Sequence, residues 1–171
     1  MKMTTSMQLQ KERQMFNKNL APIVDLMINS LGEHSDQFRA QFGRDQYSSF
    51  IREYRTIDLR VPRQTGKSTI LINKMVEQSS IMFVHNAAAR ERLRPFEHIW
   101  GSNVHARPEL DYLDRIRAKY YSRLELQFEC LMVDEPAFYT KAQESNLNEF
   151  IDFLHGRQLV TDNFYVLKLG T

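Results

Sequence analysis

The segment that most constrains the fold of this chain is Val61-Pro-Arg-Gln-Thr-Gly-Lys-Ser68, which lies between a predicted strand and a predicted helix. Before it, Ile57 and Leu59 alternate with polar residues, which is the period of a strand. After it, Ile70 and Met75 belong to an apolar face with helical spacing. A loop in this position presents successive backbone N–H groups and a helix N-terminus to an anion. The segment therefore favours an α/β fold with a phosphate-binding loop.

The residues of this loop have the chemistry that a Mg·ATP site needs. Lys67 would reach the β- and γ-phosphates, and Ser68 would hold Mg²⁺ through its hydroxyl. Gly66 would let the backbone approach the phosphates, because it has no Cβ. We expect three neighbours to line the same phosphate site: Gln64, Thr65 and Thr69. The match to G-x-x-x-x-G-K-S/T is incomplete, because Val61 occupies the first glycine position, and the Gly-Lys-Ser triplet alone is also compatible with a turn before a helix.

A second candidate site follows the apolar run Leu131–Val133, which leads into Asp134 and Glu135. A buried parallel strand that ends in two acids delivers both at the carboxyl edge of its sheet, where ligands bind in open α/β folds. Asp134 would hold the water shell of Mg²⁺, and Glu135 would orient and deprotonate the attacking water. Alone, the two acids are equally compatible with a turn before Pro136. Together, the two sites occur in the order that an ATPase requires, each at the end of a predicted strand.

Along the rest of the chain, segments with the apolar spacing of a helix alternate with segments that have the spacing of a strand. The spacing predicts helices at 22–31, 38–42, 47–54, 70–76, 87–94, 108–124 and 143–154, and strands at 57–61, 81–84, 130–133 and 164–169. We therefore predict a P-loop NTPase with a mostly parallel sheet flanked by helices. An N-terminal helical segment, residues 1–43, would precede an ATPase core at residues 44–171.

Two details of this prediction can be checked directly. Thr140 and Gln143 have the spacing of a capping box at the start of the last helix, which Gly156 would end. Asp58 and Arg60 fit poorly, since they interrupt a strand that we expect to be central and buried on both faces.

Cysteine content and charge narrow the class of protein. Cys130 is the single cysteine of the 171 residues, so no intrachain disulfide and no cysteine-based zinc site is expected, and the chain is typical of a reducing compartment. The formal net charge of +2 permits a nucleic-acid partner without indicating one. We expect neither a signal peptide nor a membrane span.

Several further residues have two interpretations. Gly170 and Thr171 follow a predicted strand, where they would sense the γ-phosphate or simply begin a loop. Gln46 would read the base edge of an adenine beside Tyr47, although an aromatic residue at helical spacing more often belongs to a core. The arginines at 90, 92 and 94 would contact DNA phosphates or, more simply, face solvent.

The loop Arg63-Gln64-Thr65-Gly66-Lys67-Ser68 resembles the deviant phosphate loop of phage large terminases, the ATPases of DNA-packaging motors. The upstream Asp45-Gln46-Tyr47 is similar to the glutamine-containing helix of that family. The strand that ends in Asp134-Glu135 and the strand that ends in Leu169-Gly170-Thr171 are similar to its acidic and coupling motifs. The resemblance covers about residues 36–171.

The resemblance implies Mg-dependent ATP hydrolysis that drives double-stranded DNA into a viral capsid. It implies a homo-oligomeric ring at the capsid portal, a small terminase subunit as partner and a location in the cytoplasm of the infected host cell. Arg63 would contact the γ-phosphate and act in catalysis with Lys67 and Glu135. Large terminases also carry a nuclease domain, which we do not expect within residues 1–171.

Three other functions remain open. A helicase-like DNA-dependent ATPase would share both sites and would differ only in translocating DNA without packaging it. A small-molecule kinase fits less well, because a water-activating Glu135 beside Asp134 is what a kinase must avoid. A nucleotide-binding regulator of a larger motor would bind ATP tightly without turnover.

Overall fold

The computed structural model describes residues 20–32, 35, 37–43, 46–61, 67–93, 103–106, 108–121 and 127–171. The strands are β1 (Thr56–Arg60), β2 (Ser80–Phe83), β3 (Val104–His105), β4 (Phe128–Asp134) and β5 (Val160–Gly170). The helices are a segment at 20–32, α2 (Tyr47–Tyr54), α3 (Lys67–Glu77), α4 (Ala87–Leu93), α6 (Leu110–Tyr121), the 3₁₀ helix η3 (Pro136–Phe138) and α7 (Lys141–Gly156).

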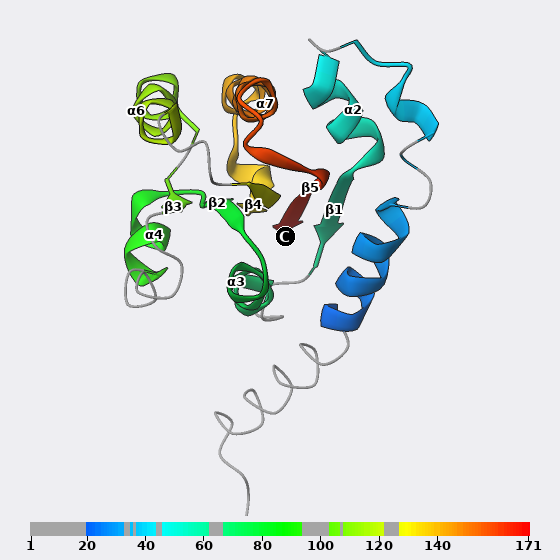
Figure 1. Ribbon diagram of the computed structural model, residues 1–171. Coiled ribbons are helices and arrows are strands. Elements are labelled where there is room, and N and C mark those ends of the chain that lie inside the picture. The colour runs from blue at the N-terminus through cyan, green and yellow to red at the C-terminus, as the bar shows by residue number, and fades with distance from the viewer. Residues whose placement is uncertain are drawn as a thin grey trace, which may run out of the picture.

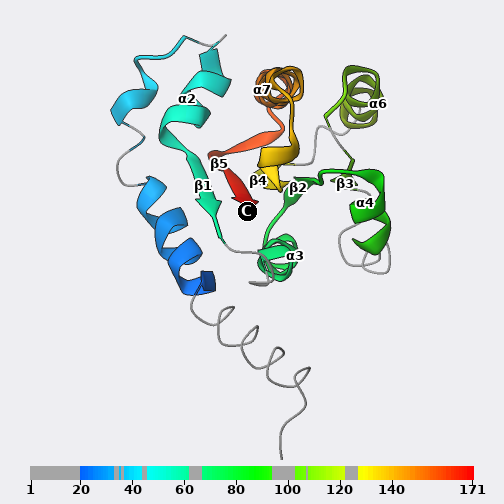
Figure 2. The same cartoon turned by 180° about the vertical axis from the view of Figure 1, so that it is seen from behind.

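The strands form one five-stranded sheet in the order β1-β5-β4-β2-β3, and every described pair is parallel. The connections through α3 and α4 run toward β3, whereas those through α6 and α7 run back toward β1. Since crossovers are right-handed, the two directions put their helices on opposite faces. Figures 1 and 2 show this arrangement, with α3 and α4 on one face and α6, α7 and α2 on the other. The expected α/β fold with a parallel sheet flanked by helices is confirmed.

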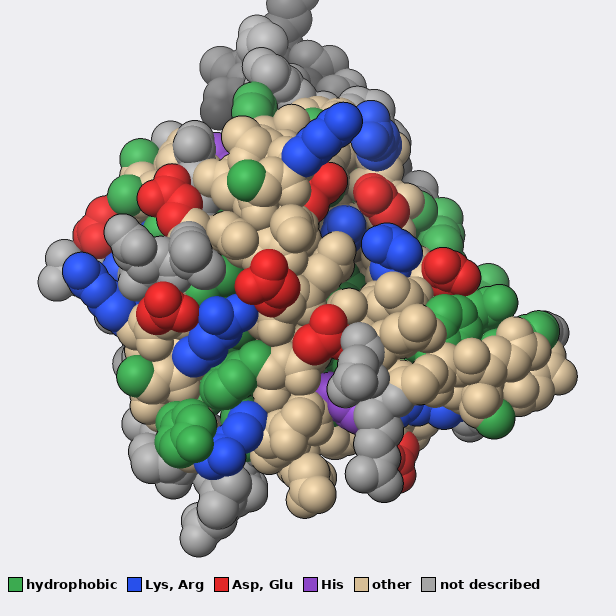
Figure 3. Space-filling model, turned by 90° about the horizontal axis from the view of Figure 1, so that it is seen from above, with side chains coloured by type: hydrophobic (Ala, Val, Ile, Leu, Met, Phe, Trp, Pro, Cys, Tyr) green, Lys and Arg blue, Asp and Glu red, His purple; other side chains and the backbone are tan. Residues whose placement is uncertain are grey.

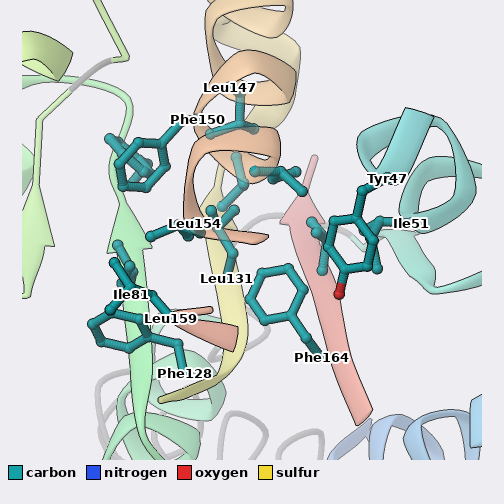
Figure 4. Close-up of a cluster of buried hydrophobic side chains, with 14 of the residues drawn as sticks. Tyr47, Ile51, Ile81, Phe128, Leu131, Leu147, Phe150, Leu154, Leu159 and Phe164 are labelled. Atoms are coloured by element: carbon teal, nitrogen blue, oxygen red, sulfur yellow. The ribbon is translucent and has the colours of Figure 1, made fainter. Parts of the chain in front are cut away.

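Each face of the sheet carries its own apolar core. On the α7 face, Leu147, Phe150 and Leu154 point from the helix onto Leu131 of β4 and its neighbours (Figure 4). The opposite core contains the alternate strand residues Cys130 and Met132 together with side chains of α3 and of the helix at 20–32. The alternation explains why β4 reads as a continuous apolar run, since both of its faces are covered.

The expectation that the first strand is central is wrong, and the correction accounts for its charges. β1 is an end strand of the described sheet and pairs only with β5 there. The side chains of Asp58 and Arg60 are therefore exposed. Asp58 also lies in register beside Lys168 of β5, so opposite charges are neighbours.

The predicted cap of α7 is confirmed in full. The Thr140 hydroxyl accepts from the Gln143 backbone N–H, and the Gln143 side chain accepts from the Thr140 N–H. Tyr47 is a buried core residue, as its spacing favoured. Within the described ranges, no helix has the length and apolar character that crossing a bilayer requires.

Candidate functional site

One edge of the sheet gathers several of the polar residues that the sequence singled out. Lys67 begins α3, Glu135 follows β4 and Thr171 follows β5. Because the strands are parallel, their carboxyl ends share this edge. At this edge the chain passes from β1 to α3 on one face of the sheet and from β4 to α7 on the other face (Figure 1). The crevice between two such connections is where open α/β sheets bind ligands.

Glu135 is the centre of this cluster and joins three segments that are far apart in sequence. Its Oε1 forms an ion pair and hydrogen bond with Lys67 Nζ, and both side chains are largely buried. Its Oε2 accepts two hydrogen bonds of 3.0 Å, one from the Thr171 backbone N–H and one from the Thr171 hydroxyl. The Glu135 N–H donates to the Leu169 carbonyl at 2.9 Å. The start of α3 and the ends of β4 and β5 are therefore bound together by one carboxylate.

The backbone of Glu135 adopts a left-handed conformation, with φ at 56° and ψ at 59°. A residue with a Cβ pays for such a conformation with strain of about 1 kcal/mol or more, and such residues concentrate at functional sites. Directly behind it, Pro136 begins η3 and packs closely on Gly170, where an added Cβ would lie 2.9 Å from the proline Cδ. The close contact of Pro136 with Gly170 therefore fixes the conformation of the turn after β4.

The two neighbouring acids differ in their electrostatic surroundings. Burial alone would raise the pKa of Glu135, but the hydrogen bonds from Lys67 and Thr171 outweigh burial and lower it. Burial raises the pKa of Asp134, and the charge of Glu135 raises it further, while His85 and Lys67 act in the opposite direction. Glu135 is therefore held as the carboxylate, whereas Asp134 would gain from a nearby cation.

A cavity of about 260 Å³ opens beside the cluster, with Ser68, His85, Asp134 and Glu135 among its lining residues. Asp134 Oδ2 lies 3.7 Å from His85 Nδ1. Asp134 Oδ1 is buried and has no hydrogen-bond partner among the described residues.

A buried carboxylate oxygen and a hydroxyl on one cavity suit Mg²⁺, which takes few protein ligands and keeps water and phosphate oxygens for the rest. Within the described ranges, no three His, Cys, Asp or Glu side chains come together as a self-sufficient metal site. The residues present therefore fit a cation that arrives with a nucleotide.

The structure brings together Lys67, Ser68, Asp134, Glu135 and Thr171, with Gly170 adjacent. Four expected loop residues lie outside the described ranges: Arg63, Gln64, Thr65 and Gly66. Thr69 is an exposed residue in the first turn of α3.

The remaining candidates lie elsewhere. Gln46 is exposed at the start of α2, and the first turn of that helix contacts α7 through a hydrogen bond from the Ser48 N–H to Asp152. Arg90 Nε donates to the Val104 carbonyl at 3.2 Å, so this arginine ties α4 to β3. The side chain of the arginine at 92 and the whole of that at 94 are outside the described part of the chain.

Sequence reasoning missed His85, although a signal was available. His85 stands just after the predicted strand 81–84. The argument that placed Asp134 at the carboxyl edge applies equally to a polar residue after any parallel strand.

Comparisons of the chain with models of protein families, with curated proteins and with solved structures find no match.

Proposed function

We propose that this chain is a Mg-dependent ATPase that drives double-stranded DNA into a viral capsid, as the ATPase part of a large terminase. The observation that carries the proposal is the contact of Lys67 with Glu135, with Thr171 on the other carboxylate oxygen. An ammonium, a general base and a hydroxyl converge at the carboxyl edge of a parallel sheet, beside a cavity that Ser68 and Asp134 also line.

The arrangement supports a simple sequence of events. A bound triphosphate competes with Glu135 for Lys67, because both partners are anionic. Release from Lys67 leaves the Glu135 carboxylate to accept a proton from water, while Thr171 keeps its other oxygen in place. Ser68 and Asp134 would hold Mg²⁺, which would neutralise charge that develops on the transferred phosphoryl group. Glu135 is thus masked until nucleotide arrives.

The DNA-packaging part of the proposal rests on the resemblance of residues 63–68, 131–135 and 169–171 to large terminases. A ring of identical subunits, a portal, a small terminase subunit and the host cytoplasm belong to the same resemblance. On the face that α6 and α7 cover, acidic and basic side chains are interspersed (Figure 3). DNA binding draws mainly on continuous basic surface, so we expect the DNA to contact another face.

The test of the ATPase is a pair of substitutions whose effects must differ. Lys67→Ala should abolish ATP binding, because it removes the phosphate contact. Glu135→Gln should lose hydrolysis by about 100-fold or more. It should bind ATP at least as tightly as the unsubstituted protein, since Lys67 no longer has to leave a carboxylate.

Binding is measured by titration calorimetry and turnover by phosphate release, with Glu144→Gln on the exposed side of α7 as the control. Equal loss of affinity in the Lys67 and Glu135 variants would refute the roles assigned here.

The metal assignment has its own test. Ser68→Ala and Asp134→Asn should each raise the Mg²⁺ concentration needed for half-maximal turnover, and Ser145→Ala, an exposed serine of α7, should not. Turnover that persists in excess chelator would exclude the assignment.

Adding double-stranded DNA separates a DNA-dependent ATPase, whether packaging motor or helicase-like enzyme, from the other two alternatives. A motor ATPase should hydrolyse faster with DNA, whereas a regulator would bind ATP without turnover and a kinase would transfer phosphate to a nucleoside instead of water.

A further inference from the structure

Two further cavities lie at the amino edge of the sheet, opposite the candidate ATP site. Their volumes are about 620 Å³ and 550 Å³. Both are lined by Arg55, Gln127 and the first residues of β5, Val160–Asp162. β5 starts below α7 and crosses toward α2 before it turns to run beside β1 (Figures 1 and 2). The start of β5 therefore lines both cavities.

Arg39 lines the cavity on the α7 side and is held by aromatic rings. Its guanidinium carbon lies 4.5 Å from the ring centre of Tyr47 and 5.1 Å from that of Phe50. Its Nη2 and His155 Nε2 are 2.9 Å apart, so His155 accepts as the neutral imidazole. Among the described residues, Arg39 has no carboxylate partner, and its Nη1 has no hydrogen-bond acceptor. These contacts fix the guanidinium in place. No acidic residue in the described part of the chain neutralises its charge.

A second guanidinium lies near the same Phe50 ring, with the guanidinium carbon of Arg55 at 5.9 Å from the ring centre. Arg55 is only 2% exposed and lines both cavities. Burial raises the pKa of Tyr47 to about 12, while the charges of Arg39 and Arg55 oppose that rise and the charge of Asp162 adds to it. Asp162 is exposed at the rim. Thr161 also lines both cavities, and its hydroxyl oxygen is buried without a hydrogen-bond partner among the described residues.

We propose that the amino-edge cavity binds a small organic anion, whose phosphate or carboxylate group lies between Arg39 and Arg55 near the Thr161 hydroxyl. Guanidinium groups match both anions geometrically, and fixing them beforehand lowers the entropic cost of binding. A volume of about 550 Å³ suits a metabolite-sized ligand. The site is separate from the candidate ATP site, because it lies at the other end of the strands.

The experiment is an NMR titration of the full chain carrying Lys67→Ala, which removes the expected phosphate contact of the loop before α3. Inorganic phosphate and acetate are added in separate titrations, so the two arms distinguish a phosphate from a carboxylate ligand. We expect saturable shifts of the amides of Gln158, Thr161 and Asp162 with at least one probe.

Arg39→Gln should weaken that binding by about tenfold, the usual scale for one charge-assisted contact. Thr161→Val is a milder second variant that removes only the hydroxyl, and it should weaken binding even if Arg39→Gln unfolds. Arg52→Gln is the matched control, since Arg52 is an exposed arginine of α2. Absence of saturable shifts with both probes, or equal affinity in the Thr161 variant and the Arg52 control, would overturn the proposal.

Discussion

Glu135 shows how a single residue can be over-determined by its surroundings. Its left-handed backbone costs free energy, yet its N–H, both carboxylate oxygens and the following proline each have a fixed partner. Such strain persists only where neighbouring contacts compensate for it. The precise direction of the carboxylate therefore depends on residues of β5 and α3 as much as on its own turn.

Gly170 is the residue whose substitution should disturb this turn most directly. A Cβ there would lie 2.9 Å from Pro136 Cδ and 3.3 Å from its Cγ, and the ring cannot rotate away. We expect Gly170→Ala to lower the free energy of unfolding by about 1–3 kcal/mol, as overpacking does, and to slow ATP hydrolysis by displacing Glu135. Urea denaturation and phosphate release measure the two effects.

Gly156→Ala is the control for this prediction. No atom lies within 4 Å of the position where its Cβ would be, and the residue ends a helix. The change should be neutral or stabilising by up to about 1 kcal/mol. If both alanine variants behaved alike, steric contact at Gly170 would not be the cause.

The acids and the lysine of the site were predictable because the rule that places them is local. A polar residue directly after an apolar strand must lie at the carboxyl edge, and Lys67 directly precedes a helical face. The ion pair between Lys67 and Glu135 was not predictable, since it depends on which strands are neighbours. Arg39 and Arg55 gave no signal at all, because their surroundings come from four separate segments of the chain.

At the scale of elements, the length and the periodicity of a segment decided whether the sequence could predict it. α7 has a long apolar face and a complete cap, so both its existence and its start were predictable. β3 has two residues and pairs with β2 alone in the described sheet, so it was missed. β5 begins at Val160, earlier than expected, because polar residues occupy its cavity-lining start. The position of β1 in the sheet was misjudged because strand order is a property of the topology.

The cap of α7 makes a quantitative prediction at this scale. Thr140→Ala removes the acceptor for the Gln143 N–H and should lower the free energy of unfolding by about 1 kcal/mol. Thr140→Ser keeps an acceptor and should lose much less. Chemical denaturation compares the three proteins, and equal losses in both variants would show that the methyl group of Thr140, and not its oxygen, matters.

At the scale of the whole molecule, two helical layers enclose a sheet whose opposite edges differ in chemistry. The carboxyl edge gathers Lys67, Asp134 and Glu135, whereas the amino edge gathers Arg39 and Arg55. The inner strands β2 and β4 are largely apolar and buried on both faces, so a change of shape at either edge would disturb the two cores. The free energy of unfolding of the whole molecule therefore reports on changes at either edge. One buried histidine controls part of the pH dependence of this free energy.

His105 lies in β3 with 4% of its surface exposed, and its Nε2 is 3.2 Å from the Tyr120 hydroxyl of α6. Burial lowers its pKa to about 3, and the charges of Lys119 and Arg90 contribute. The unfolded chain takes up this proton near pH 6.5, whereas the folded chain does not. Stability is therefore full above pH 6.5 and falls as the pH decreases toward 3.

The loss should reach a slope of about 1.4 kcal/mol per pH unit below pH 6.5. Carboxylates such as Glu135, for which the ordinary pKa is 4.5, also make the stability fall as the pH decreases, but only at lower pH. Asp134, whose pKa is raised, acts with the opposite sign in both proteins, so the difference between the unsubstituted protein and a His105 variant in the window between pH 6.5 and 4.5 isolates the histidine. His105→Gln keeps a polar side chain beside Tyr120 but cannot titrate. Urea denaturation across this window should show stability that declines more steeply in the unsubstituted protein than in the variant. Parallel declines would mean that His105 takes up its proton in the folded state, and that β3 and α6 do not shield it from water.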